Sequence, residues 1–141
     1  MSIWKSSSSC DEKPWGSESA FSSPFGMGGK IIDIKSGKRT SLKYYLKKNQ
    51  VMYVLSGRIS VFAPNEKEFG DMHSPEGNYF DLKKGDIILI QSENPYRIKA
   101  IEDSKIVEVC VGAASYHNEF VMLEDDFGRK NENVCFDQKD N

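Results

Sequence analysis

Lysines and tyrosines that alternate along residues 39–47 have the clearest potential for chemistry. In an extended strand alternate side chains share a face. One face therefore carries Ser41, Lys43, Tyr45 and Lys47, and the other carries Leu42, Tyr44 and Leu46. A lysine ammonium group binds carboxylates or phosphates, and a lysine of lowered pKa beside a tyrosine can move a proton between adjacent carbon atoms. The run predicts anion binding or proton transfer, and an ordinary solvated strand face is the alternative.

Histidines and cysteines do not form a second candidate. His73 and His117 are more than forty positions apart and lack ligand spacing. The three cysteines, Cys10, Cys110 and Cys135, form neither a disulfide framework nor a zinc pattern, which favours a reducing cytoplasm. The glycine-rich residues 26–29 precede a predicted strand and not a helix, so they do not indicate a phosphate-binding loop.

Short runs rich in β-branched and aromatic residues must position these side chains. They cover residues 30–34, 39–46, 51–55, 58–62, 79–82, 87–90, 96–101 and 105–111, with a turn signal in each gap. This spacing predicts an all-β antiparallel sandwich or barrel. Little helix is expected, with a weak candidate turn at 115–119. In the last run Glu108 shares a face with Ile106 and Cys110, and the opposite face is apolar. These faces predict a polar-lined mouth and an outer apolar layer covered by a second sheet or a partner subunit.

Length and charge limit the domain organisation and the partners. The 141 residues fit one domain, which we place at 13–129, between an N-terminal flexible or exchanging arm at 1–12 and a polar tail at 130–141. A net charge of −2 gives no strong field for nucleic acid or for an acidic membrane. No apolar run is long enough to span a bilayer, and the start lacks the apolar segment of a signal peptide. The sequence therefore predicts a cytoplasmic protein.

Several motifs resemble one family, in the right order along residues 13–129. Residues 13–16, 34–43 and 53–58 resemble the cupin domain of type II phosphomannose isomerases, which also occurs fused to mannose-1-phosphate guanylyltransferases. Residues 82–86 resemble the second cupin motif, and residues 123–129 resemble the family's ending. The resemblance implies a double-stranded β-helix, or jelly-roll barrel, that is usually dimeric.

The family's metal ligands are replaced in this sequence. By resemblance to the first motif, Lys43 stands where the family has Gln, Tyr45 where it has His, and Gln50 where it has Glu. In the second motif, Tyr96, just before Arg97, stands where the family has His. Lys47 stands where some members carry another His. Ammonium groups repel a cation, and phenols are poor ligands at neutral pH. The sequence therefore predicts no metal at this position and no cofactor.

Three functions follow from these replacements. The predicted site comprises Lys43, Tyr45, Lys47, Gln50, Tyr96, Arg97 and Glu108, with Lys47 and Arg97 near its rim. The leading interpretation is binding of a small polar ligand, a sugar or sugar phosphate by descent, by a homodimer. One alternative is a metal-independent sugar isomerase or epimerase in which Lys43 and either Tyr45 or Tyr96 act as acid and base. In the other, Glu108 neutralises Lys43 and plugs the barrel of a dimeric structural or regulatory module.

Overall fold

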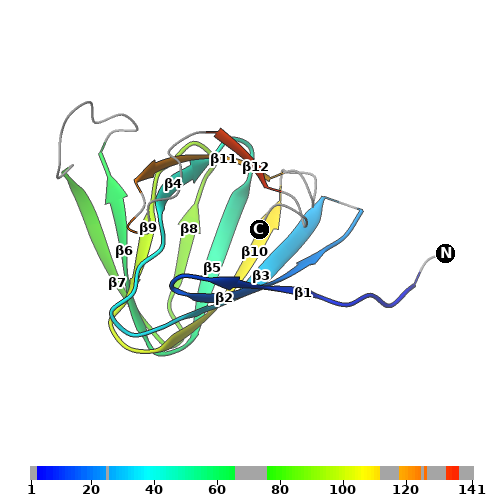
Figure 1. Cartoon of the computed structure of the whole chain (residues 1–141), viewed down its shortest axis with the longest axis horizontal. Helices are drawn as coiled ribbons and strands as arrows, with labels where there is room; N and C mark the ends of the chain where they lie inside the picture. The colour runs from blue at the N-terminus through cyan, green and yellow to red at the C-terminus, as the bar shows by residue number, and fades with distance from the viewer. Residues whose placement is uncertain are drawn as a thin grey trace.

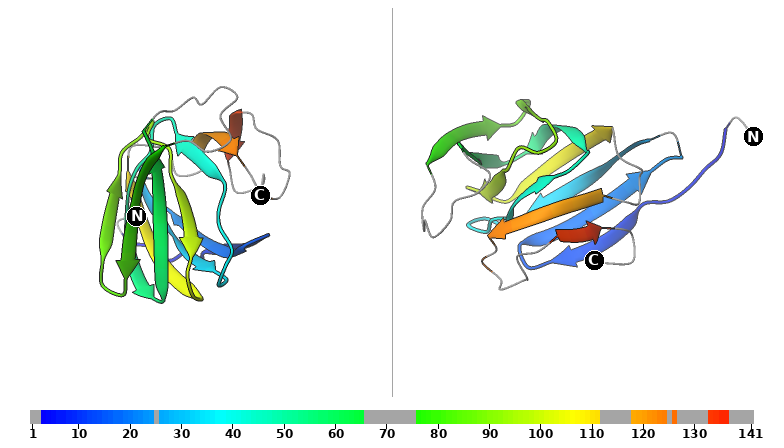
Figure 2. Two further views of the ribbon diagram at one scale, coloured as in Figure 1. Left: turned by 90° about the vertical axis from the view of Figure 1, so that its left-hand side faces the viewer. Right: turned by 90° about the horizontal axis from the view of Figure 1, so that it is seen from above.

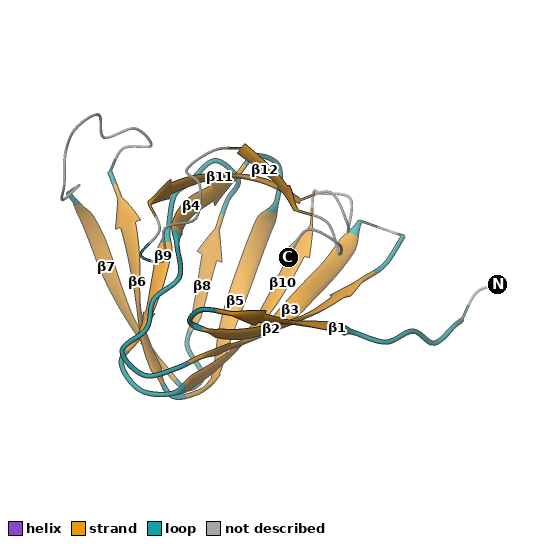
Figure 3. Cartoon of the chain, viewed as in Figure 1, coloured by secondary structure: helices purple, strands orange, loops and turns teal. Residues whose placement is uncertain are grey.

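The computed structural model describes residues 3–24, 26–65, 76–111, 118–124, 126 and 133–136. Every regular element in these ranges is a β-strand (Figure 3), as the spacing of the sequence runs predicts. The strands are β1 (Ser9–Lys13), β2 (Gly16–Ser22), β3 (Met27–Ile34), β4 (Leu42–Tyr45), β5 (Asn49–Ser56), β6 (Arg58–Pro64), β7 (Gly77–Lys83), β8 (Ile87–Ile90), β9 (Arg97–Ala100), β10 (Ser104–Val111), β11 (Asn118–Glu124) and β12 (Asn133–Phe136). The described residues include no helix that is long and apolar enough to cross a membrane.

Six antiparallel strands form the larger sheet, in the order β1-β2-β3-β10-β5-β8 (Figure 1). Strand β10 lies between β3 and β5, although those strands are far apart in sequence. Its register sets Glu108 opposite Lys30 of β3 and Met52 of β5. Because opposite residues in a ladder point to the same face, this register carries their side chains to the same side of the sheet.

The remaining strands form the second layer, in two groups of three with the orders β7-β6-β9 and β12-β11-β4. Two isolated bridges join the groups, Arg39 to Lys99 and Lys43 to Tyr96. At the second bridge the Tyr96 amide donates to the Lys43 carbonyl at 3.0 Å, and the Lys43 amide donates to the Tyr96 carbonyl at 3.2 Å. Together the two layers make a jelly-roll sandwich. In the view from above in Figure 2, β11 (orange) and β12 (red) of the second layer lie over the blue strands of the larger sheet.

Branched aliphatic side chains from both layers fill most of the space between the sheets. Ile34, Val54 and Ile106 come from the larger sheet, and Ile59 and Ile98 face them from the second layer. Gly57 makes the tight turn between β5 and β6 with a φ of +85°. A Cβ atom at this position would lie 2.3 Å from the Ser104 hydroxyl oxygen, so the turn requires glycine.

The structure adds strands at both ends of the sequence-predicted series. Strand β1 includes residues 9–12, from the predicted arm, and residues 3–8 extend away from the sheets (Figure 1). Residues 133–136 of the predicted tail form β12, and residues 127–132 and 137–141 lie outside the described residues. Of the turn expected at 115–119, residues 118–119 begin β11 and residues 115–117 lie outside the described residues.

Candidate functional site

Four charged side chains lie buried together between the sheets. Glu18 comes from β2, Lys30 from β3, Glu108 from β10, and Lys48 from the segment between β4 and β5. Lys48 and Glu108 are only 1% exposed. With the Tyr45 phenol, these side chains are called the inner cluster.

Each carboxylate of the inner cluster has a lysine close to it. Lys48 Nζ lies 2.9 Å from Glu108 Oε2, and Lys30 Nζ lies 2.9 Å from Glu18 Oε2. A second lysine, Lys13, also lies near Glu18, with its Nζ 3.6 Å from Glu18 Oε1. Burial opposes ionisation of both acids, but the lysines outweigh it: Lys30 and Lys43 lower the pKa of Glu18 to about 2, and Lys48 and Lys30 lower the pKa of Glu108. Both carboxylates are therefore ionised at neutral pH.

Tyr45 lies among three ammonium groups. Lys48 Nζ is 3.8 Å from the centre of the Tyr45 ring, Lys43 Nζ is 5.3 Å away and Lys30 Nζ is 6.0 Å away. These distances suit cation–π contacts. Burial disfavours the phenolate, but the three positive charges together lower the pKa of Tyr45 to about 8. Tyr45 therefore gives up its proton more readily than an ordinary tyrosine.

Tyr96 has the opposite electrostatic environment. Its hydroxyl donates to Gln50 Oε1 at 3.4 Å, and both side chains are buried. Burial, together with the negative charges of Tyr45 and Glu108, raises the pKa of Tyr96 well above its ordinary value. The site thus holds one phenol that ionises readily and one that keeps its proton.

Five of the predicted site residues are buried: Tyr45, Gln50, Tyr96, Arg97 and Glu108. Lys43 is half-buried, with its ammonium 5.0 Å from the ring centre of Phe120. The predicted neutralisation of Lys43 by Glu108 is wrong, because Glu108 is paired with Lys48. Lys47 is exposed. Its neighbour Lys48 is the residue that points inward.

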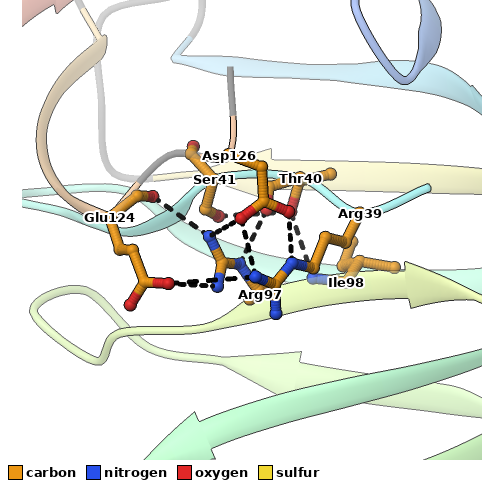
Figure 4. Close-up of polar contacts among 7 residues, drawn as sticks. All are labelled: Arg39, Thr40, Ser41, Arg97, Ile98, Glu124 and Asp126. Carbon is orange, nitrogen blue, oxygen red and sulfur yellow. Dashed lines mark hydrogen bonds and ion pairs between the residues drawn. The ribbon is translucent and has the colours of Figure 1, made fainter. Parts of the chain in front are cut away.

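Arg97 does not join the inner cluster, contrary to the expectation that it borders the same site. It follows Tyr96 in the chain and is buried in a separate network (Figure 4). Its guanidinium donates to the Thr40 carbonyl at 2.8 Å and to Glu124 Oε1 at 3.2 Å. Asp126 lies 3.7 Å from Arg97 and also bonds to Arg39. This network ties the end of β11 to β9 and to the segment before β4.

Comparison with known proteins supports the fold, but it does not identify a ligand or an activity. No protein-family model matches the chain, and no curated protein sequence does. KdgF from Halomonas sp. has a TM-score of 0.59 at 16% identity, covering 73% of this chain and 84% of its own. The Schizosaccharomyces pombe Cnp3 cupin domain has a TM-score of 0.57 at 16% identity, covering 69% and 64%. The chain has a cupin fold. A mutant of Bacillus subtilis oxalate decarboxylase OxdC has a TM-score of 0.62 at 18% identity. The match covers 74% of this chain and 27% of that protein.

Glu18, Lys30 and Lys48 are not among the site residues that the sequence predicts. The sequence carried one signal for Lys30, which shares strand parity with Ile32 and Ile34 and therefore faces the interior of the protein with them. Glu18 lies in a strand whose sequence, Gly-Ser-Glu-Ser-Ala-Phe-Ser, has few strand-forming residues. Lys48 lies beyond the end of β4, where parity no longer applies.

The donor set does not suit the divalent metal that the resemblance implies. Tyr45, Gln50 and Tyr96 stand at three of the ligand positions carried over by that resemblance, and Lys43 and Lys48 place positive charges beside the Tyr45 ring. Within the described ranges, no three His, Cys, Asp or Glu side chains are grouped as metal ligands. A divalent ion prefers imidazole, carboxylate or thiolate. No chemical step is therefore assigned to a metal.

A surface cavity of about 600 Å³ lies away from these residues. It is formed by β7, β8 and the turn between them, and is lined by Tyr79, Phe80, Asp81, Leu82, Gly85, Asp86, Ile87 and Ile88. None of the predicted site residues lines it. Asp81 is already bonded to Arg58, and Asp86 accepts from the Lys83 amide.

Proposed function

We propose that the polar end of this cupin binds a small anionic ligand, of the sugar phosphate class, without a metal ion. The proposal rests on the surroundings of the Lys43 side chain. This side chain is half-buried between the rings of Tyr45 and Phe120, and no described carboxylate forms a salt bridge with it. Lys30 and Lys48, by contrast, each lie 2.9 Å from a carboxylate. A half-buried ammonium group over two aromatic rings is suited to an anion.

The chemistry around Lys43 also favours an anion over a neutral sugar. Lys43 lowers the pKa of both Glu18 and Tyr45, so its positive charge acts on the inner cluster. Burial lowers the pKa of Lys13, and Lys43 contributes to this lowering. A phosphate or carboxylate beside Lys43 would relieve this repulsion. Descent from a sugar-phosphate isomerase, which the sequence motifs suggest, agrees with this ligand class.

Removal of the Lys43 charge is expected to weaken anion binding. A charge-assisted hydrogen bond contributes about 1.5–3 kcal/mol, so Lys43→Met should lower affinity by roughly 10- to 100-fold. A panel of sugar phosphates, the matching unphosphorylated sugars and inorganic phosphate would be tested by thermal shift. A ligand at 100 times its Kd stabilises the fold by about 2.7 kcal/mol. Lys99→Met, an exposed lysine on β9, is the matched control and should bind like the wild type.

Two results would contradict the proposal. Equal shifts in the wild type and Lys43→Met would show that anions bind elsewhere, and no shift with any ligand would favour a plugged structural module. The Lys48–Glu108 pair, with side chains only 1% and 2% exposed, would then be the plug. Stoichiometric zinc, iron or manganese in the purified protein would reject the metal-free part of the proposal.

The two buried tyrosines favour a second candidate function, metal-independent isomerisation or epimerisation of a sugar. Such reactions need a base and an acid near adjacent carbon atoms. The environments of Tyr45 and Tyr96 move their pKa values in opposite directions, which separates the two roles. In this mechanism Tyr45 accepts the proton and Tyr96 donates one, with Lys43 as the ammonium group that holds the substrate anion.

Ionisation of Tyr45 can be measured directly. Ultraviolet absorbance should show one tyrosine of the folded protein ionising with a pKa of about 8, and Tyr45→Phe should abolish that step. Tyr44→Phe, at the next position of β4, is the control and should retain it. If the cupin is an isomerase, Tyr45→Phe should also abolish exchange of deuterium from solvent into the carbon beside the sugar carbonyl. Full exchange in that variant would remove the second candidate.

A further inference from the structure

The residues at the centre of the candidate site are closed off from solvent. Tyr45 is 3% exposed, Gln50 5% and Tyr96 4%. Lys43, whose ammonium lies 5.3 Å from the centre of the Tyr45 ring, is half-buried. A ligand held at Lys43 can therefore touch the two phenols only after part of the surrounding wall has moved.

Strand β11 forms the wall next to Lys43 and Tyr45. Its register with β4 sets Phe120 opposite Tyr45 and Met122 opposite Lys43. The ring centres of Phe120 and Tyr45 lie 5.7 Å apart in an edge contact, and the Lys43 ammonium lies 5.0 Å from the Phe120 ring centre. Phe120 and Met122 are both buried in the core. This strand therefore covers the candidate site on the side of Lys43.

The pairing of β11 is shorter than that of the strands in the larger sheet. Strand β10 pairs with β3 over eight positions and with β5 over seven. Strand β11 pairs over four positions with β4 and over four with β12. Its ladder with β4 also shifts register between Met122 and Glu124. Strands with short or irregular ladders open locally more readily than central strands, so β11 is the wall best able to move.

Four charged side chains fasten the end of β11, and together they are called the clasp: Arg39, Arg97, Glu124 and Asp126 (Figure 4). Arg39 donates to both carboxylate oxygens of Asp126, to Oδ1 at 2.6 Å. Arg97 donates to the Glu124 carboxylate at 3.2 Å and to the Glu124 carbonyl at 3.3 Å. Because Arg97 lies on β9 and Arg39 precedes β4, the clasp joins the end of β11 to both neighbouring segments.

The clasp has one fixed side and one side that water can release. Arg97 is buried, and its Nε donates to the Thr40 carbonyl at 2.8 Å, which holds the guanidinium in place. The side chains of Arg39, Glu124 and Asp126 are 41%, 42% and 34% exposed. Exposed ion pairs contribute little to stability because water competes for both partners. The clasp can therefore break and re-form without unfolding the sheets.

We propose that β11 is a lid on the candidate site and that the clasp holds it closed. Release of the clasp lets the end of β11 separate from β4, which withdraws Phe120 from Lys43 and Tyr45. The anion then enters against Lys43, and the clasp re-forms behind it. The two arginines of the clasp are thus positioning residues, which act on the ligand through β11. The identity of the ligand rests on the proposed function, whereas the movement of β11 does not.

Hydrogen exchange of single backbone amides, measured by NMR on the full chain, tests the lid without a ligand. Asp126→Asn removes the charge that both arginines contact and should speed exchange of the amides at 120–122 about 10-fold. The amides at 106–109 in β10 should exchange at the wild-type rate. Arg58→Gln is the matched control, because Arg58 and Asp81 form a similar exposed pair between β6 and β7. It should leave exchange in β11 unchanged.

Association kinetics connect the lid with the ligand. Mannose 6-phosphate and inorganic phosphate are the probes, and stopped-flow fluorescence measures their association rates. Asp126→Asn and Arg39→Gln should each raise the association rate about 10-fold, since a larger fraction of molecules is open. Arg58→Gln should bind at the wild-type rate. A variant that only weakened the fold would lower the melting temperature without speeding association.

The two measurements fail in different ways. Acceleration by the same factor in β11 and β10, or none in β11, would overturn the lid, because the clasp would then stabilise only the fold as a whole. Probe binding at an unchanged rate, despite faster exchange in β11, would show that the ligand enters by another route and would also overturn the proposal. Faster exchange confined to β11, with neither probe bound, would support the lid and count against the proposed function instead.

Discussion

Replacing Glu108 with glutamine is expected to destabilise the folded protein by about 3–5 kcal/mol. The substitution keeps the size of the side chain and removes its charge, which leaves Lys48 and Lys30 in the interior without that carboxylate. An uncompensated buried ammonium group is far more costly than a buried ion pair. Urea unfolding at neutral pH, followed by tryptophan fluorescence, measures the change.

Two further variants show whether the loss of stability in Glu108→Gln comes from the buried charge. Glu102→Gln changes an exposed glutamate in the turn before β10 and should alter stability by less than about 0.5 kcal/mol. The double variant Lys48→Met with Glu108→Leu removes both charges and should recover most of the lost stability. If Glu108→Gln costs less than about 1 kcal/mol, water or another group must replace the lost interaction, and the pair is not a structural plug.

The Glu108 and Lys43 experiments test two different roles. A plug explains the Lys48–Glu108 pair, but it leaves the half-buried Lys43 without a described carboxylate. A ligand explains Lys43, and the Lys48–Glu108 pair then forms the rigid floor of its site. The two roles are compatible, because different lysines perform them. A strong stability effect at Glu108 combined with a strong ligand effect at Lys43 would therefore assign both.

Strand alternation predicts much of this fold because antiparallel strands with turns leave a period of two in the sequence. The runs at 30–34, 51–55, 58–62, 87–90 and 105–111 fall within β3, β5, β6, β8 and β10. Strands β1 and β2 carry no such signal. Their residues are mostly polar, and they are strands because β2 pairs along its whole length with β3. Tertiary pairing overrides weak local propensity there.

The site is harder to predict than the strands because it depends on register between distant segments. Parity alone places Tyr45 and Glu108 on polar inner faces, and both are buried. It cannot say which lysine reaches Glu108, since Lys48 follows an irregular segment whose direction the tertiary structure sets. The same limit explains Arg97, whose parity is opposite to that of Tyr96 and whose partners Glu124 and Asp126 lie far along the chain.

Acid is expected to remove a large part of the stability that Glu18 contributes. The pKa of Glu18 is about 2 in the folded protein, because Lys30 and Lys43 outweigh the cost of burial, against an ordinary value of 4.5. A carboxyl with a lowered pKa stabilises the fold fully above its unfolded pKa and loses that effect as the pH falls towards the folded one. The difference corresponds to about 3 kcal/mol, lost between about pH 5 and pH 2.

Glu18→Gln isolates this effect from the other carboxylates. The variant should be less stable than the wild type at neutral pH, and the difference in unfolding free energy between the two should shrink as the pH falls from about 5 to about 2. Glu12→Gln, an exposed acid on β1, should run parallel to the wild type throughout. Urea unfolding at each pH gives these curves. A Glu18→Gln profile that stays parallel to the wild type would mean that Lys30 and Lys43 do not hold Glu18 in its ionised form.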